Sequence, residues 1–255
     1  MQIQDQHFVV TGGSSGLGQG VATHLIGMGA NVSLFDVNAV AGTQTASDLG
    51  SCAEFFQCDI TSESSVTESL ASAVGRFGPI NGLINCAGIP GAQRILGKHG
   101  THDLESFSRI VQVNLIGTFN MIRLAAEQMQ SNPPGEDGER GVIISTASVA
   151  AFDGQIGQAA YAASKAGVAS MTLPLARELA RFGIRVLTIA PGLFKTPMMD
   201  VLPDEVQKSL GESVPFPKRL GQPSEFAQLV QQMIENRLLN GETVRLDGSI
   251  RLAAQ

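Results

Sequence analysis

The chain has 255 residues, of which 43% are hydrophobic and 16% charged. This composition supplies enough apolar material for a sizeable core, and it excludes an intrinsically disordered chain. The net charge of −6 argues against a nucleic-acid-binding surface, and no apolar run has the roughly 18 residues that a membrane-spanning helix needs. The three cysteines show no metal-ligand spacing, which favours a reduced, intracellular setting.

Short apolar segments alternate along the chain with longer helical patterns. Strands are predicted over residues 7–11, 31–36, 53–58, 82–86, 141–146, 184–190 and 243–246, and helices over residues 16–29, 62–77, 103–130 and 158–182. This alternation is typical of βαβ units with a parallel sheet. The strands are continuous runs of Val, Ile and Leu, which predicts that helices cover both faces of that sheet.

Three segments interrupt the alternation. They are a Gly-rich connection over residues 89–101, a polar Pro/Gly loop over 131–140, and a Pro-rich stretch over 192–221 with one short helical piece at 204–210. Loops of this length within a compact domain often serve as lids or binding loops. Since no linker or repeat divides the chain, we expect a single domain over residues 1–255, with a substrate-binding loop at about 192–221.

A glycine-rich turn joins the first predicted strand to the first predicted helix. It reads Thr-Gly-Gly-Ser-Ser-Gly-Leu-Gly over residues 11–18. Glycine lets the backbone turn tightly and approach a pyrophosphate, while the helix N-terminus offers free N–H donors and positive partial charge. An ordinary strand-to-helix loop is the alternative interpretation. The position directly after the first strand favours dinucleotide binding.

Polar and small residues follow the next predicted strands. Asp36 ends the second strand, where a carboxylate can bind the adenosine ribose hydroxyls and repel a 2′-phosphate, so we expect NAD rather than NADP. A helix cap or turn is the alternative for Asp36, and capping is the alternative to adenine contact for Asp59. The small residues at 85–88 leave room for a ligand at the end of the fourth strand, and we interpret Cys86 among them as buried packing.

Three residues form a candidate catalytic set. Tyr161 and Lys165 lie one helical turn apart and share a face, and Ser148 follows the fifth strand. A free tyrosine has a pKa near 10, and a neighbouring cation lowers it, so Lys165 can make Tyr161 an acid–base group for a hydroxyl or a carbonyl. Ser148 can hydrogen-bond the same oxygen. Taken alone, each residue has an ordinary structural interpretation: Tyr161 and Lys165 could cover a helix surface, and Ser148 could be a helix N-cap. Their combination with a nucleotide-binding loop favours a catalytic role.

These motifs, together with Asn114 and Pro191-Gly192, resemble the short-chain dehydrogenase/reductase family over essentially the whole chain. The resemblance implies an α/β fold, a doubly wound Rossmann fold with a seven-stranded parallel sheet and helices on both faces. It implies that Tyr161 is the acid–base group, and that Lys165 lowers its pKa and binds the nicotinamide ribose. Ser148 would orient the substrate, and Asn114 would hold a water of the proton relay. The implied NAD-binding residues are Gly12, Ser14, Ser15, Gly16, Leu17, Gly18, Asp36, Asp59, Ile60, Asn85, Ala87, Gly88, Tyr161, Lys165, Pro191, Gly192, Phe194 and Thr196.

A narrower resemblance concerns the type II 3-hydroxyacyl-CoA dehydrogenases, a group also called type 10 17β-hydroxysteroid dehydrogenase. It is carried by residues 141–163, 188–196, 214–221 and 240–250. The implied reaction is NAD-dependent oxidation of an (S)-3-hydroxyacyl-CoA to the 3-ketoacyl-CoA, reversible with NADH. The resemblance also implies a homotetramer. We expect the protein in the cytoplasm or, for a eukaryotic relative, in the mitochondrion.

The substrate contacts expected near the chemistry are Ser148, Gln158, Tyr161, Phe194 and Leu202. No metal site is expected, because the Gly-rich segment that holds His99 and His102 lacks further ligands in register.

Three alternatives stay open at this point. One is a hydroxysteroid or other secondary-alcohol dehydrogenase, and another is a 3-ketoacyl-acyl-carrier-protein reductase, although Asp36 argues against the NADPH preference of such reductases. The third is a catalytically silent NAD-binding subunit, which the presence of both Tyr161 and Lys165 disfavours.

Overall fold

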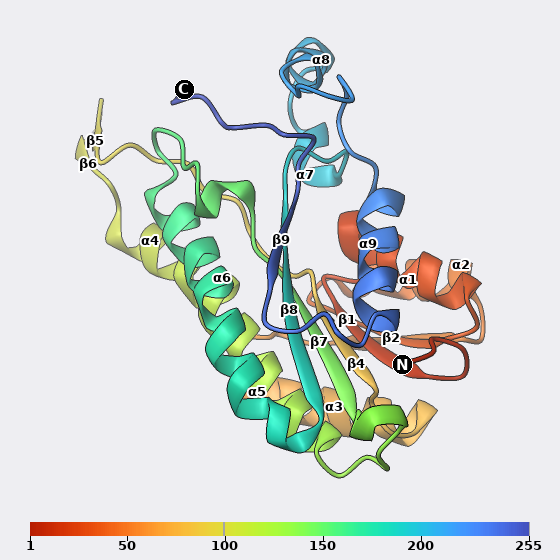
Figure 1. Ribbon diagram of the computed structural model, residues 1–255. Coiled ribbons are helices and arrows are strands. Elements are labelled where there is room, and N and C mark those ends of the chain that lie inside the picture. Colours follow the sequence, from red (N-terminus) through yellow and green to blue (C-terminus); the bar gives the residue numbers. More distant parts are fainter. Residues whose placement is uncertain (99, 255) are drawn as a thin grey trace.

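The structure is a computed structural model that describes residues 1–98 and 100–254. Its main sheet has seven strands in the order β3-β2-β1-β4-β7-β8-β9, and every pairing is parallel (Figure 1). The strands are β1 (His7–Thr11), β2 (Asn31–Asp36), β3 (Ala53–Gln57), β4 (Gly82–Asn85), β7 (Gly141–Thr146), β8 (Ile184–Pro191) and β9 (Thr243–Leu246). The predicted strands are confirmed, and the order reverses between β1 and β4 as in a doubly wound Rossmann fold.

Helices cover both faces of the sheet. Figure 1 shows α1, α2 and α9 on one side, and α3, α5 and α6 on the other. Each layer buries its own apolar cluster, with Phe8 and Phe226 in the first and Leu70 and Met121 in the second. Burial of each such side chain contributes about 1.5–3 kcal/mol. The helices are α1 (Gly16–Gly27), α2 (Ala39–Leu49), α3 (Glu63–Phe77), α4 (Leu104–Val111), α5 (Thr118–Met129), α6 (Ala159–Leu179), α7 (Pro197–Asp200), α8 (Asp204–Glu212) and α9 (Pro223–Glu235).

Three helices, α2, α7 and α9, were not predicted from the sequence, although the two longer ones, α2 and α9, both carry start signals. The Asn38 side chain accepts a hydrogen bond from Ala41 N over 3.1 Å at the start of α2, and Gly50, with φ +83°, follows its end. In α9, Pro223 occupies the first turn, and the Glu225 carboxylate accepts from Gln222 N over 2.8 Å. The capping residues could therefore have predicted both helices, whereas the apolar periodicity did not.

The helix predicted over residues 103–130 is interrupted. It begins at Asp103, whose carboxylate accepts from Ser106 N over 2.7 Å, and it consists of α4 and α5 joined by a π-helical segment, Gln112–Gly117. A Cβ at Gly117 would lie 2.7 Å from Ile60 Cγ1, so glycine lets the loop after β3 pack closely on this helix. Single π-helical turns inside α-helices are frequent at functional sites, and this one contains Asn114.

The irregular segments lie outside the sheet. Residues 89–101 include a short hairpin of β5 (Leu96–Gly97) and β6 (Gly100–Thr101), which projects from the molecule in Figure 1. His99 lies outside the described residues. Residues 192–221 carry α7 and α8, and α8 confirms the short helical piece predicted there. None of the helices in the described part of the chain is both long and apolar enough to cross a membrane.

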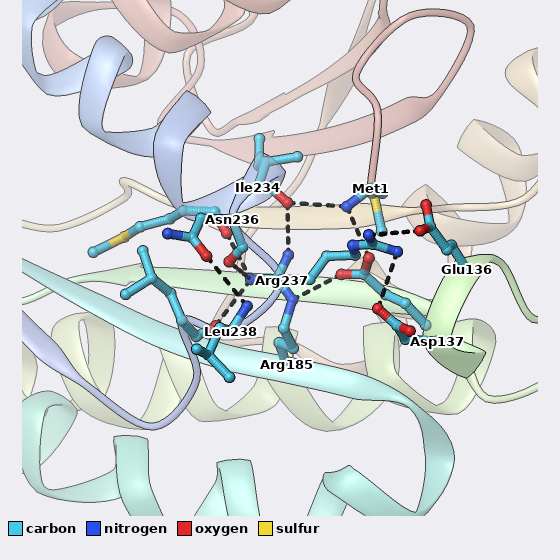
Figure 2. Close-up of polar contacts among 11 residues, drawn as sticks. Met1, Glu136, Asp137, Arg185, Ile234, Asn236, Arg237 and Leu238 are labelled. Carbon is cyan, nitrogen blue, oxygen red and sulfur yellow. Dashed lines mark hydrogen bonds and ion pairs between the residues drawn. The ribbon is translucent and has the colours of Figure 1, made fainter.

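A polar network lies at the amino end of β8, opposite the edge where the strands end (Figure 2). Arg185 is buried and pairs with Glu139 over 2.8 Å, and its guanidinium also donates to backbone carbonyls at the end of α9. Beside it, Arg237 pairs with Glu136 over 2.8 Å and with Asp137 over 3.1 Å. The loop over residues 131–140 is thus held to the α9–β9 connection, far along the strands from their carboxyl ends.

Candidate active site

The turn between β1 and α1 brings backbone atoms close together. Gly12 has φ +62°, and a Cβ at this position would lie 2.9 Å from Ala87 N and Cα. Gly16 has φ +54°, and a Cβ at Gly18 would collide with the Gly12 carbonyl oxygen. Side chains at these positions would therefore fill or distort the turn. The result is an open cradle of backbone N–H groups at the start of α1, which suits a pyrophosphate.

Two buried polar atoms beside this cradle are unsatisfied. Within residues 1–98 and 100–254, Ser14 Oγ and Asn85 Oδ1 have no hydrogen-bond partner. The Asn85 amide nitrogen, in contrast, donates to Ser145 Oγ over 3.3 Å. Most buried polar groups are hydrogen-bonded, so orphaned ones at a strand edge need an explanation. A polar ligand in the cradle supplies it, and the residues present therefore fit a dinucleotide.

The carboxylates after β2 and β3 shape the two neighbouring turns. Asp36 accepts from Ser14 N over 3.3 Å and from Asn38 N over 3.0 Å, which ties it to the glycine-rich turn. Asp59 accepts from the backbone and hydroxyl of Thr61. The helix-cap interpretation is wrong for both aspartates, because Asn38 caps α2 and Ser62 caps α3. The turn interpretation of Asp36 is compatible with its hydrogen bond to Asn38.

The candidate catalytic side chains meet where β7 ends. Lys165 Nζ donates to the carbonyl oxygen of Thr146, the last residue of β7, over 2.8 Å, and it lies 5.9 Å from the centroid of the Tyr161 ring. Ser148 follows β7, and its Oγ accepts from Ala150 N over 3.1 Å. Ser148 is thus also the N-cap of a short 3₁₀ turn, and its hydroxyl can still donate a hydrogen bond, to Tyr161 or to a ligand.

Burial controls the titration of these groups. It lowers the pKa of Lys165 to about 8, and it raises the pKa of Tyr161, with the Ser148 side chain acting in the opposite direction. The expected lowering of the Tyr161 pKa by Lys165 is therefore not present in the protein alone, because desolvation of the phenol is the largest effect on this pKa. Burial also raises the pKa of Cys86 to about 12, which agrees with the interpretation of Cys86 as a packing residue.

Asn114 is fully buried and is held by protein groups. Its Oδ1 accepts from Ile89 N over 2.8 Å, and its Nδ2 donates to Ile89 O over 3.0 Å and to Ser164 Oγ over 3.2 Å. A Cβ at Gly88 would lie 3.1 Å from Asn114 Oδ1 and 3.3 Å from Lys165 Nζ. The side-chain amide thus fixes the backbone after β4 beside Lys165. This is a positioning role for the side chain, and the water-holding role that the resemblance implies for Asn114 stays a prediction.

Residues after β8 form the other wall of the site. Gly192 follows Pro191, and a Cβ there would lie 2.9 Å from Asp247 Cα. The side chain of Thr196 would lie 3.4 Å from a Cβ at Gly16, so the start of the loop over 192–221 rests on the glycine-rich turn. The glycine-rich turn, Asp36, Asn85, Lys165, Gly192 and Thr196 therefore lie along the carboxyl edge of the sheet.

The expected substrate contacts differ in their surroundings. Phe194 is buried against Phe226, with ring centroids 6.2 Å apart, so its side chain serves the core and does not support the expected substrate contact. Gln158 is held by Gln155, whose backbone N–H donates to Gln158 Oε1 over 3.1 Å. Leu202 is exposed between α7 and α8.

Two residues that support the site were not predicted from the sequence. Ser164, fully buried, receives the Asn114 amide hydrogen bond and donates to Tyr161 O over 2.8 Å, which links the π-helical segment to α6. Asn120 Nδ2 donates to Ile60 O over 2.9 Å and so holds the loop after β3. Ser164 lies between Tyr161 and Lys165 in sequence, and this position is the one feature of the sequence that could have indicated its role in the site. Nothing in the sequence marks Asn120.

Comparisons with known proteins agree with this geometry. The family described as short chain dehydrogenase matches residues 6–207. The chain is 54% identical over 246 residues to 3-hydroxyacyl-CoA dehydrogenase type-2 of Homo sapiens, covering 96% of this chain and 94% of the human protein.

This chain belongs to the short-chain dehydrogenase family. It is therefore an oxidoreductase, and with the family it binds a nicotinamide dinucleotide, NAD(P). The family resemblance inferred from the sequence motifs is confirmed.

Two solved structures share the whole fold. The crystal structure of 3-hydroxyacyl-CoA dehydrogenase type-2 from Mycobacterium avium has a TM-score of 0.93 at 40% identity, covering 98% of this chain and 97% of that one. The 3-ketoacyl-(acyl-carrier-protein) reductase from Brucella melitensis, complexed with NADH, has a TM-score of 0.88 at 28% identity, covering 98% of this chain and 100% of that one. The Rossmann fold expected from the resemblance is thus confirmed.

Proposed function

We propose that this protein is an NAD-dependent dehydrogenase that interconverts an (S)-3-hydroxyacyl-CoA and the corresponding 3-ketoacyl-CoA. The observation that carries the proposal is the placement of Ser148, Tyr161 and Lys165 at the end of β7, beside the glycine cradle. The same chain is 54% identical to a human protein named 3-hydroxyacyl-CoA dehydrogenase type-2. That identity is well above the 28% shared with the Brucella reductase, which supports the dehydrogenase over the reductase alternative.

The dinucleotide would lie along the carboxyl edge of the sheet. The cradle over residues 12–18 would hold the pyrophosphate, Asp59 and Ile60 would border the adenine, and Thr196 would meet the nicotinamide end. When bound, the oxidised cofactor supplies the acceptor for the hydride that leaves the carbinol carbon. The polar atoms Ser14 Oγ and Asn85 Oδ1, which are orphaned within the described residues, support a ligand at this place.

Proton transfer is the task of Tyr161. For reduction, its neutral phenol donates a proton to the ketone oxygen, and the raised pKa of Tyr161 keeps that proton in place at neutral pH. Ser148 donates to the same oxygen, since a ketone oxygen can only accept, while Ser148 Oγ itself accepts from Ala150 N. For oxidation, Tyr161 must take the proton, and the positive charge of Lys165 favours the phenolate.

NAD rather than NADP is favoured by Asp36. Its carboxylate lies at the end of β2 and accepts from the backbone of the glycine-rich turn, Ser14 N. At this position a ribose hydroxyl can donate to the carboxylate, whereas a 2′-phosphate with nearly two negative charges would be repelled. This charge difference supports NAD as the cofactor.

The acyl-CoA substrate would enter over the loop at residues 192–221. Leu202 and the other exposed apolar residues of this loop, such as Met198 and Val201, offer apolar surface for an acyl chain. Gln158 lies one turn before Tyr161 and remains our candidate for a polar contact with the substrate. Closure of the loop would exclude water from the hydride transfer.

The decisive test is reduction of acetoacetyl-CoA by purified protein, followed as loss of NADH absorbance, with NADPH in parallel. We expect rapid turnover that strongly prefers NADH. Tyr161→Phe should retain NADH binding and lose about 10²–10⁴-fold in rate, the usual contribution of a general acid. Near-normal turnover by Tyr161→Phe would contradict the assigned role, and NADH binding without turnover of acetoacetyl-CoA would contradict the proposed substrate.

We also propose that residues 1–255 form one domain that assembles into a homotetramer. Ile116 and Phe119 on the α4–α5 helix and Leu173 on α6 are exposed apolar side chains of the layer that covers one sheet face. A helix layer with exposed apolar side chains supports packing against a second subunit. Light scattering on a sizing column tests the proposal, and a monomer mass would contradict it.

A further inference from the structure

A single arginine joins two parts of the chain that border the proposed active site. Arg245 lies in β9, and its guanidinium donates from Nε to Asp247 Oδ2 over 2.7 Å and from Nη2 to Asp153 Oδ2 over 2.6 Å. The guanidinium also lies 5.4 Å from the centroid of the Phe152 ring. The side chains are mostly shielded from solvent, at 22% exposure for Arg245, 19% for Asp153 and 8% for Asp247. Water therefore screens these pairs less than it screens an exposed surface pair.

Asp153 belongs to the segment that carries the reactive hydroxyls. It follows the 3₁₀ turn Val149–Ala151, which Ser148 caps, and its backbone N–H donates to Val149 O over 2.9 Å. Helix α6, with Tyr161 in its first turn, comes next in the chain. Among the described residues, Arg245 is the one ion-pair partner of Asp153. A fixed Asp153 therefore fixes the turn that presents Ser148.

Asp247 belongs to the turn on which the loop over 192–221 rests. Gly192, at the start of that loop, packs so closely that a Cβ there would lie 2.9 Å from Asp247 Cα and Cβ. Near the other end of the loop, Phe216 N donates to Gly248 O over 3.3 Å. Both ends of the loop thus contact the turn that follows β9, and Arg245 binds the carboxylate of that turn.

We infer that Arg245 is a positioning residue for the reaction. By binding both Asp153 and Asp247, it fixes the position of Ser148 relative to the two ends of the loop over 192–221. The inference rests on the proposed function, because it concerns the oxygen that Ser148 binds and the loop that covers the substrate. Arginine suits the task, since its planar fork can bind two carboxylates at once, whereas lysine is a point charge. A shift of a reacting group by about 1 Å can cost up to roughly 100-fold in rate.

The chain offers a matched control for this arginine. Arg237 also bridges two carboxylates, Glu136 over 2.8 Å and Asp137 over 3.1 Å. It lies at the opposite end of the strands, in the network of Figure 2. Loss of Arg237 therefore removes two ionic contacts, to carboxylates that are 78% and 74% exposed, without touching the proposed site.

The test compares Arg245→Met, Arg245→Lys and Arg237→Met in steady-state reduction of acetoacetyl-CoA with NADH. We expect Arg245→Met to lower kcat by about 10- to 100-fold, with the Kd for NADH unchanged. Arg245→Lys should recover part of this loss, and Arg237→Met should keep the wild-type kcat. Asp153→Asn is the second variant if Arg245→Met fails to fold, and it should also lower kcat.

Hydrogen exchange separates this inference from the proposed function. Amides over residues 149–158 should exchange faster in Arg245→Met than in the wild type, and at the wild-type rate in Arg237→Met. A wild-type kcat in Arg245→Met, or an equal fall in both methionine variants, overturns the inference. If the wild-type protein does not reduce acetoacetyl-CoA, the proposed substrate fails, and unchanged exchange over 149–158 is then the result that overturns the inference.

Discussion

The ammonium group of Lys165 donates a hydrogen bond to the carbonyl oxygen of Thr146 over 2.8 Å, at the buried end of β7. No carboxylate in the described part of the chain forms an ion pair with it. Desolvation therefore dominates and lowers the pKa of Lys165 to about 8. The buried positive charge of Lys165 serves the reaction, but its desolvation lowers the free energy of unfolding, and this loss of stability can be measured.

We predict that Lys165→Met abolishes turnover and makes the cofactor-free protein more stable at neutral pH. Because the pKa of Lys165 is lower in the folded protein than in the unfolded chain, the unfolded chain binds more protons between about pH 8 and 10.5. The free energy of unfolding of the wild type therefore rises with pH through this window. Below it, the buried charge costs on the order of 3 kcal/mol, partly offset by about 1 kcal/mol from the Thr146 hydrogen bond.

Urea unfolding at pH 7 and at pH 10 measures this effect. The stability advantage of Lys165→Met should be about 1–3 kcal/mol at pH 7 and should shrink at pH 10. The difference between the two proteins, rather than either curve alone, isolates Lys165 from other titrating groups. An advantage that is absent at pH 7, or that grows with pH, would show that the ammonium is not desolvated.

The second prediction concerns the close packing of Gly88 against Lys165 and Asn114. A Cβ at Gly88 would lie 3.3 Å from Lys165 Nζ and 3.1 Å from Asn114 Oδ1, and the φ angle of Gly88 is not in the left-handed region. Gly88→Ala should therefore displace these two groups by a few tenths of an ångström without straining the backbone. We expect kcat to fall by about tenfold or more, with the Tm little changed.

Gly75→Ala is the control for Gly88→Ala. Gly75 lies within α3, and a Cβ there would meet nothing within 4 Å. Replacing a glycine inside a helix by alanine stabilises it by about 0.5–1 kcal/mol, so this variant should gain stability and keep the wild-type kcat. If Gly88→Ala also keeps the wild-type kcat, the close contact with Lys165 has no catalytic role.

The sequence was sufficient for the sheet and for placing Ser148, Tyr161 and Lys165 near one end of it, because both depend on local patterns. Short segments rich in apolar residues marked all seven strands, although β9 contains Arg245, and fixed spacing marked Tyr161, Lys165 and Ser148. It was not sufficient for contacts that the fold creates. The pairing of Arg245 with Asp153 joins distant parts of the chain, and the packing of Phe194 on Phe226 depends on the place of α9.

The direction of the Tyr161 pKa shift illustrates the same limit. From the sequence, the neighbouring Lys165 predicts a lowered pKa for Tyr161. In the folded protein, burial raises it, since desolvation of the phenol outweighs the lowering effect of the Ser148 hydrogen bond. How deeply a side chain is buried is a property of the whole packed layer, so spacing within one helix cannot reveal it.

Asp36 carries the prediction on cofactor choice. Asp36→Ala should relax the preference for NADH over NADPH by at least about tenfold, which corresponds to about 1.4 kcal/mol, because the repulsion of a 2′-phosphate is removed. The measurement is kcat/KM with each cofactor. Asp36→Asn separates two contributions, since it removes the charge but keeps an oxygen that can accept from Ser14 N or Asn38 N. Unchanged discrimination in Asp36→Ala would mean that another group reads the ribose.

Glu139 tests the polar network around Arg185, at the other end of the strands. Its side chain is 7% exposed and pairs with Arg185 Nε over 2.8 Å, and the Met1 amino group lies 2.8 Å from its other oxygen. Glu139→Gln leaves the buried guanidinium of Arg185 without its counter-charge, which typically costs about 3–5 kcal/mol. Urea unfolding should show a loss of this size, while kcat stays at the wild-type value because the strands separate Glu139 from the site. A loss below about 1 kcal/mol is typical of solvated ion pairs, and such a result would show that water reaches this network.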